Sequence, residues 1–109
     1  MMDITYLTNR LVPVLKRYKI QKAILFGSIA RGEASPRSDV DLILVQNTNH
    51  RFLERYDGIL MEISKAVPDR DVDVLIYTPD ELEKLASRRF IKQAFGEGRV
   101  IYELSLIHI

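Results

Sequence analysis

Residues 22–32 read KAILFGSIARG, and this stretch decides the fold of the chain. The apolar run that ends at Phe26 has the length and composition of a buried strand. Gly27 ends the run, and the residues after it predict one helical turn that is stopped by Gly32. Such a turn presents free backbone N–H groups, together with the Ser28 hydroxyl, toward one point, which suits a phosphate. Glycine at position 27 also removes the side chain that would block close approach.

Strands and helices alternate along the rest of the chain. The predicted strands cover residues 22–26, 39–45, 71–77 and, as an edge strand or docking tail, 99–102. Helical periodicity predicts helices over residues 4–18, 51–66, 78–85 and 88–95. Pro13 is expected either to split the first helix or to mark a new start. Thr78, Pro79 and Glu81 form the capping-box pattern of a helix N-terminus. This alternation indicates an α/β or α+β protein.

Composition excludes several classes of protein. The chain has no cysteine, which rules out disulfides, thiol nucleophiles and zinc–thiolate sites. Hydrophobic residues make up 47% of its 109 residues, which favours one globular domain over a disordered chain. The formal net charge of +1 does not suggest a nucleic-acid-binding protein. We find neither a signal-peptide pattern nor an apolar run long enough for a membrane span, so we expect a cytoplasmic protein.

Three aspartates carry the predicted chemistry. Asp39 and Asp41 are separated by one residue, so strand geometry places both carboxylates on one face of the sheet. Adjacent carboxylates repel each other unless a cation neutralises them, and their hard oxygen ligands favour magnesium or manganese. Asp73 repeats the pattern on the next predicted strand, whereas Asp71 is a weaker candidate nearer the loop. Three carboxylates at one edge suit a two-metal site, in which Asp39 and Asp41 would ligate both ions. Asp73 would ligate the ion nearer the acceptor and receive its proton.

Each part of this pattern also has an ordinary structural explanation. A single aspartate at the start of a strand is usually a turn or cap residue, and Gly-Ser is common in turns between strands and helices. Their combination in one sequence is much less common. Here an apolar strand, Gly-Ser, the Asp-x-Asp motif and a third aspartate follow one another in this order. We therefore predict a nucleotide and metal site.

The same residues resemble a known family signature. Phe26 to Gly32, together with Ser38-Asp39-Val40-Asp41-Leu42, is similar to the signature of the polymerase-β-like nucleotidyltransferases. The chain looks most like their minimal nucleotidyltransferase (MNT) group of small single-domain proteins, over about residues 5–103. The resemblance implies an α+β palm domain, a two-layer α/β arrangement in which a small mixed sheet is flanked by helices.

The resemblance also implies ligands and a partner. It places Gly27 and Ser28 on the triphosphate of a nucleotide, and Asp39, Asp41 and Asp73 on magnesium. Many similar proteins are antitoxins that neutralise a HEPN-domain toxin RNase encoded beside them, in the studied mode by transferring AMP from ATP to a toxin tyrosine. We therefore predict a metal-dependent nucleotidyltransferase that binds ATP and two Mg²⁺ ions and modifies a HEPN toxin.

Other functions and roles stay open. The protein could be an antitoxin that acts by binding alone, or a nucleotidyltransferase for a small molecule such as an antibiotic. The lack of a second domain for such a substrate favours a protein acceptor. Arg31 is a candidate phosphate contact, although an arginine beside a helix terminus more often forms an ion pair. Arg51 and Arg55, like the basic residues of 88–92, are expected on a solvated face. The sequence assigns no residue to the nucleotide base. It does not specify the oligomeric state, and a homo-oligomer is one alternative.

The last six residues, 104–109, look out of place. They follow a natural ending at Glu103 and resemble the translated end of a transposase adapter used in sequencing libraries. We hypothesise that residues 1–103 form the nucleotidyltransferase domain and that the tail is not natural coding sequence, so that the chain is cut there. A hydrophobic C-terminal strand is the alternative. Codons that differ from those of the adapter would contradict the hypothesis.

Overall fold

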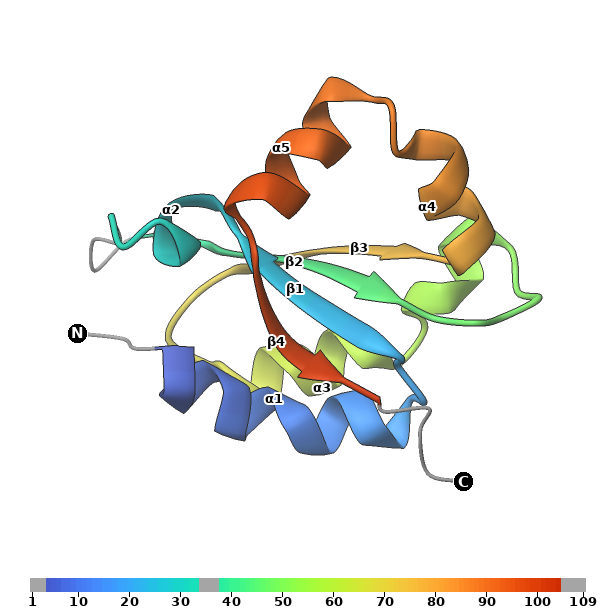
Figure 1. The fold of residues 1–109 in the computed structure, drawn as a ribbon. Helices are drawn as coiled ribbons and strands as arrows, with labels where there is room; N and C mark the ends of the chain where they lie inside the picture. Colours follow the sequence, from blue (N-terminus) through green and yellow to red (C-terminus); the bar gives the residue numbers. More distant parts are fainter. Residues whose placement is uncertain (1–3, 34–37, 105–109) are drawn as a thin grey trace.

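The computed structural model describes residues 4–33 and 38–104, which form a four-stranded sheet with helices on both faces (Figure 1). The sheet order is β3-β2-β1-β4. The strands are β1 (Lys22–Phe26), β2 (Val40–Val45), β3 (Val72–Tyr77) and β4 (Arg99–Glu103). β1 pairs antiparallel with β2 and β4, whereas β2 and β3 run parallel. The predicted α+β class with a small mixed sheet is confirmed, and the last predicted strand forms an edge of the sheet.

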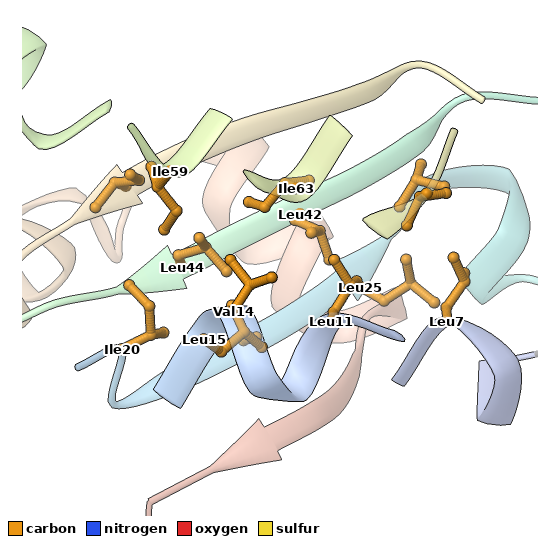
Figure 2. Packing of buried hydrophobic residues seen from close by; sticks show 14 of the residues in the cluster. Leu7, Leu11, Val14, Leu15, Ile20, Leu25, Leu42, Leu44, Ile59 and Ile63 are labelled. Carbon is orange, nitrogen blue, oxygen red and sulfur yellow. The ribbon is translucent and has the colours of Figure 1, made fainter. Parts of the chain in front are cut away.

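The larger core lies between the sheet and two helices, α1 (Ile4–Arg17) and α3 (Ile59–Ala66). Figure 2 shows buried side chains from these helices and from β1 and β2 meeting there: Leu7, Leu11, Val14, Leu15, Leu25, Leu42, Leu44, Ile59 and Ile63. Pro13 is exposed on α1 and does not split it. Since buried apolar residues precede and follow Pro13, packing holds the helix together despite the missing hydrogen bond.

A smaller core covers the opposite face of the sheet. α5 (Arg89–Glu97) places Ile91 and Ala94 against Ile24 and Ile43. α4 (Pro79–Leu85) precedes α5 and begins with the predicted capping box. In that box, Thr78 Oγ1 accepts a hydrogen bond from the Glu81 N–H, and Glu81 Oε1 accepts one from the Thr78 N–H. As with every helix in the described part of the chain, neither α4 nor α5 has the length and apolar character needed to cross a membrane.

The helix predicted over residues 51–66 is wrong, because the structure divides this segment. A 3₁₀ helix, η1 (Phe52–Tyr56), is followed by a break and then by α3. Gly58 causes the break, since its φ of +79° belongs to the left-handed region, and a Cβ there would lie 2.8 Å from Tyr18 Oη. Leu53, which the periodic pattern places on the buried face, is consequently 80% exposed.

The solvated position predicted for Arg55 is also wrong. Its side chain is buried and donates two hydrogen bonds to the Glu81 carboxylate, at 2.5 Å and 2.9 Å. It also donates to the backbone carbonyls of His50 and Ile76. Arg55 therefore joins η1 to the end of β3 and to the N-terminus of α4. Sequence periodicity could not show this arrangement, because the glutamate lies 26 residues away.

Strand ends from three different segments meet at one edge of the sheet. β1 ends at Phe26 beside the start of β2, because these strands are antiparallel. β3 starts at the same edge, because it runs parallel to β2. A short helix, α2 (Gly27–Ala30), continues directly from β1. This edge therefore collects the predicted phosphate-binding turn and the predicted carboxylates.

The described chain ends at Leu104. Its backbone N–H donates a hydrogen bond of 2.7 Å to the Gln21 carbonyl, which extends the pairing of β4 with β1. The remaining residues of the proposed non-natural tail, 105–109, lie outside the described residues.

Candidate active site

Asp41 and Asp73 lie side by side at this edge. They are register partners in the parallel pairing of β2 with β3. Since side chains alternate along a strand, Asp41 lies on the same face as Ile43, which is the face covered by α5. Burial raises the pKa of the Asp41 carboxyl, and the neighbouring Asp73 and Asp39 carboxylates raise it further. The structure thus brings together two carboxylates that the sequence separates by 32 residues, with Asp39 close enough to act electrostatically on Asp41.

Gly27 lies directly against Asp41. Its φ of +78° belongs to the left-handed region, and a Cβ built on it would overlap with Asp41 Oδ2. Phe26 is the register partner of Asp41 across β1 and β2, which explains why the next residue comes so close to the carboxylate. Glycine is therefore required at position 27 for two independent reasons, the backbone conformation and the space occupied by Asp41.

Ser28 is located in the single turn of α2. Backbone hydrogen bonds from Arg31 to Gly27 and from Glu33 to Ser28 close this turn. The Ser28 side chain is half-buried, and within the described ranges its hydroxyl has no hydrogen-bond partner. A hydroxyl at the start of a helical turn, next to backbone N–H groups, has the chemistry to hydrogen-bond a phosphate oxygen.

Arg31 is engaged in ion pairs. Its Nε lies 2.8 Å from Glu33 Oε1, and its Nη1 lies 3.2 Å from Glu97 Oε2. Hydrogen bonds to Glu33 and then to Glu97 raise the pKa of the guanidinium, so Arg31 is always charged. Its positive charge also favours the ionised form of Asp41. Arg31 thus links α2 to α5 across the edge of the site, and its phosphate contact stays a prediction.

The carboxylates fit a divalent cation chemically. Among the residues that the structure describes, no group of three histidine, cysteine, aspartate or glutamate side chains forms a ready metal site. Asp41 and Asp73 nevertheless supply hard oxygen donors, and burial first and then repulsion by Asp73 raise the pKa of Asp41. Asp39 is exposed and lies one residue before β2. A cation between these groups would remove the repulsion, so the donor set suits magnesium or manganese.

A cavity of about 210 Å³ lies beside Gly27, between α2 and α5. The residues that line it are Phe26, Gly27, Arg31, Phe90, Gln93, Ala94 and Glu97. The α5 side of this cavity was not predicted, because the basic residues of that helix favour a solvated face. The signal was present in the spacing of residues 90, 93, 94 and 97, which places them on one side of a helix.

Comparison with known proteins identifies the family. The polymerase beta nucleotidyltransferase family matches residues 9–105. Two relatives come from Methanocaldococcus jannaschii, and both are described as "putative protein adenylyltransferase". The first is 29% identical over 93 residues, covering 85% of this chain and 96% of that protein. The second is 26% identical over 87 residues, covering 79% and 82%.

Solved structures share the fold. One is a toxin–antitoxin complex with AMP-PNP, with a TM-score of 0.64, 22% identity, and coverage of 90% of this chain and 74% of the solved chain. Another contains a tri-AMPylated Shewanella oneidensis HEPN toxin in complex with an MNT antitoxin, with a TM-score of 0.59, 19% identity, and coverage of 93% and 73%. The fold agrees with the family match, which spans most of the chain. This protein belongs to the polymerase beta nucleotidyltransferase family.

Proposed function

We propose that this protein transfers AMP from ATP to a tyrosine of a partner HEPN-domain toxin and thereby acts as its antitoxin. The observation that carries the proposal is the pairing of Asp41 with Asp73 directly beside Gly27. This arrangement places paired carboxylates next to a glycine-containing turn, which is the chemistry that a magnesium-bound triphosphate needs.

Separate residues of the site would bind the phosphates and the metal ions. Gly27 and Ser28 would bind phosphate oxygens, and Arg31 would contact a phosphate after leaving one of its glutamate partners. Asp39, Asp41 and Asp73 would hold two Mg²⁺ ions. When bound, these ions would neutralise the phosphate charge and polarise the reacting phosphoryl group.

The reaction is an in-line displacement. The acceptor tyrosine Oη would form a bond to the α-phosphorus of ATP, while the bond from that phosphorus to pyrophosphate breaks. Asp73 would take the proton from the tyrosine hydroxyl, because its carboxylate is exposed at the open side of the site. The products are an AMP–tyrosine ester and pyrophosphate.

The relatives support this choice of donor and acceptor. Two proteins similar to this chain are described as "putative protein adenylyltransferase", an activity that uses an adenylyl donor and a protein acceptor. Chains with the same fold occur in toxin–antitoxin complexes, one with AMP-PNP and one with a tri-AMPylated HEPN toxin.

We also propose that residues 1–103 form the catalytic domain, that residues 104–109 are not natural, and that the protein acts in the cytoplasm.

The test uses the protein encoded by the adjacent gene, where a short all-helical protein with an Arg-x4-His-x-Tyr motif is expected. ATP labelled at the α-phosphate should label this partner in the presence of the wild-type chain. Asp41→Ala should abolish both the labelling and the neutralisation of toxicity. Asp80→Ala, which removes an exposed aspartate at the start of α4, is the matched control and should retain both.

Two results would contradict the proposal in different ways. Neutralisation by the Asp41→Ala variant would show that the antitoxin acts by binding, so that transfer would not be its mechanism. Label that enters small molecules instead of the partner would indicate a small-molecule nucleotidyltransferase.

A further inference from the structure

We propose that the cavity between α2 and α5 binds the nucleobase of the donor nucleotide, with Phe90 as its stacking residue and Gln93 at its edge. This inference rests on the proposed function, because it assigns the base of the same nucleotide whose phosphates bind at Gly27 and Ser28. No sequence motif indicates which residues bind the base, and the cavity supplies them.

The cavity has the position that a base-binding site requires. Gly27 lines the cavity and also touches Asp41, so the cavity opens directly beside the carboxylates. Phe26 lines its inner wall, immediately after the buried part of β1. Since a nucleotide is a continuous molecule, its base must bind beside the site of its phosphates. The cavity meets this condition and lies on the same face of the sheet as the carboxylates.

The cavity also has an aromatic surface on which a base can stack. The Phe26 and Phe90 rings meet edge to face, with their centroids 5.8 Å apart and an interplanar angle of 86°. Phe90 is 50% exposed, although it lies over a cavity and not on a flat surface. A base stacked on this ring would cover apolar surface that water now reaches, and stacking of this kind accepts any base.

The charges around the cavity favour a neutral ligand over a phosphate. The cation at the rim of the cavity, Arg31, already faces two carboxylates, Glu33 and Glu97. While both ion pairs are formed, these three groups sum to a net charge of −1, which disfavours a phosphate inside the cavity but has no such effect on a neutral base. The phosphates therefore belong at Gly27 and Ser28 and the base belongs against α5.

Gln93 supplies a polar group that can hydrogen-bond to the edge of a base. Gln93 lines the cavity three residues after Phe90 and points its amide toward Glu97, at a long distance of 3.4 Å. A glutamine amide has both a donor and an acceptor, so it can exchange this weak contact for hydrogen bonds to the edge of a base. Phe90 and Gln93 lie one helical turn apart and can therefore act on the same ligand.

The experiment measures binding of MgATP and of magnesium tripolyphosphate to the full chain by calorimetry. Phe90→Leu keeps an apolar side chain but removes the aromatic face. It should weaken MgATP binding by about 5- to 150-fold, the range for loss of one base–aromatic stack, and leave tripolyphosphate binding unchanged. Phe90→Trp should retain MgATP binding. Phe95→Leu is the matched control, because Phe95 is on the same helix, is 41% exposed and does not line the cavity.

The outcomes separate this proposal from the proposed function. Wild-type binding of MgATP with no loss in Phe90→Leu would overturn the base site and leave the proposed function intact. Equal losses for MgATP and tripolyphosphate, or an equal effect of Phe95→Leu, would also overturn it, because the change would then act on the phosphates or on the helix as a whole. Failure of the wild-type chain to bind either ligand would overturn both proposals.

Discussion

The carboxylate of Asp41 occupies the space in which a side chain at residue 27 would begin. Gly27→Ala would therefore displace the Asp41 carboxylate and also strain the backbone, because the φ of +78° disfavours any residue with a Cβ. We expect loss of nucleotidyl transfer, together with a decrease of about 1–3 kcal/mol in the free energy of unfolding. Urea unfolding and transfer of labelled AMP measure the two effects.

Gly32 supplies the control for this substitution. Its φ is +76°, but no described atom lies within 4 Å of a Cβ built there. Gly32→Ala should consequently have a similar backbone strain and keep the activity. If both variants lost transfer to the same extent, the close contact with Asp41 would not be the reason that position 27 needs glycine.

Asp73→Asn tests the repulsion between the paired carboxylates. Burial raises the pKa of Asp41 from its ordinary value of 3.8, and the neighbouring Asp73 carboxylate raises it further, so the ionised pair destabilises the folded protein at neutral pH. Without metal, we expect Asp73→Asn to be more stable than the wild type at pH 8. The gain should be absent well below pH 3.8, where the Asp41 carboxyl is protonated in both the folded and the unfolded state, and it should grow as the pH rises. Thermal unfolding across this pH range checks the sign.

The Asp73→Asn variant should also lose its stabilisation by MgATP. MgATP should raise the melting temperature of the wild type but not that of Asp73→Asn, since binding to the folded state stabilises a protein. Asp71→Asn is the comparison variant, because Asp71 lies just before β3 and outside the paired residues of β2 and β3. A loss of the MgATP response in Asp71→Asn alone would make Asp71 the third ligand.

The central part of the site was predictable because local rules determine it. A short apolar strand, a glycine and a helical turn follow one another in sequence, and strand alternation alone places Asp39 and Asp41 on one face. The position of Asp73 beside Asp41 needed one further step, the parallel pairing of β2 with β3, which the sequence does not encode locally.

The features that the sequence did not reveal depend on contacts between distant segments. Periodicity continues through Gly58, so it could not show that Tyr18 approaches that glycine and that the helix breaks there. Arg55 has the sequence context of a surface residue and is buried only because α4 brings Glu81 to it. The cavity beside α5 likewise exists only after the helix packs on the sheet.

Glu81→Gln tests the link between η1 and α4. Hydrogen bonds from Arg55 lower the pKa of Glu81 to about 2, from 4.5. This carboxylate therefore stabilises the fold fully above pH 4.5, and the stabilisation is lost as the pH falls toward 2. At pH 7, Glu81→Gln should lower the free energy of unfolding by about 1–2 kcal/mol, a modest value because Glu81 is more than one-third exposed.

The pH dependence distinguishes this ion pair from a general effect of charge. Glu83→Gln removes the same charge from the same helix, at an exposed position with no ion-pair partner in the described ranges. It should have little effect at any pH, whereas the deficit of Glu81→Gln should shrink between pH 4.5 and pH 2. A deficit that stayed constant down to pH 2 would mean that packing of the side chain, and not its charge, matters.

Arg31 offers the sharpest choice between a structural and a functional role. If it contacts a phosphate, Arg31→Met should weaken binding of MgATP and magnesium tripolyphosphate alike, by roughly ten-fold, because one hydrogen bond between charged groups is lost. Glu33→Gln removes the ion-pair partner at 2.8 Å without touching the cavity, so it should leave both affinities equal to or higher than those of the wild type. If Arg31 only ties α2 to α5 through Glu97, Arg31→Met should lower the melting temperature, Glu33→Gln should not, and neither should change the affinity for tripolyphosphate. Calorimetry with tripolyphosphate therefore decides the role, because this ligand has no base for the cavity to bind.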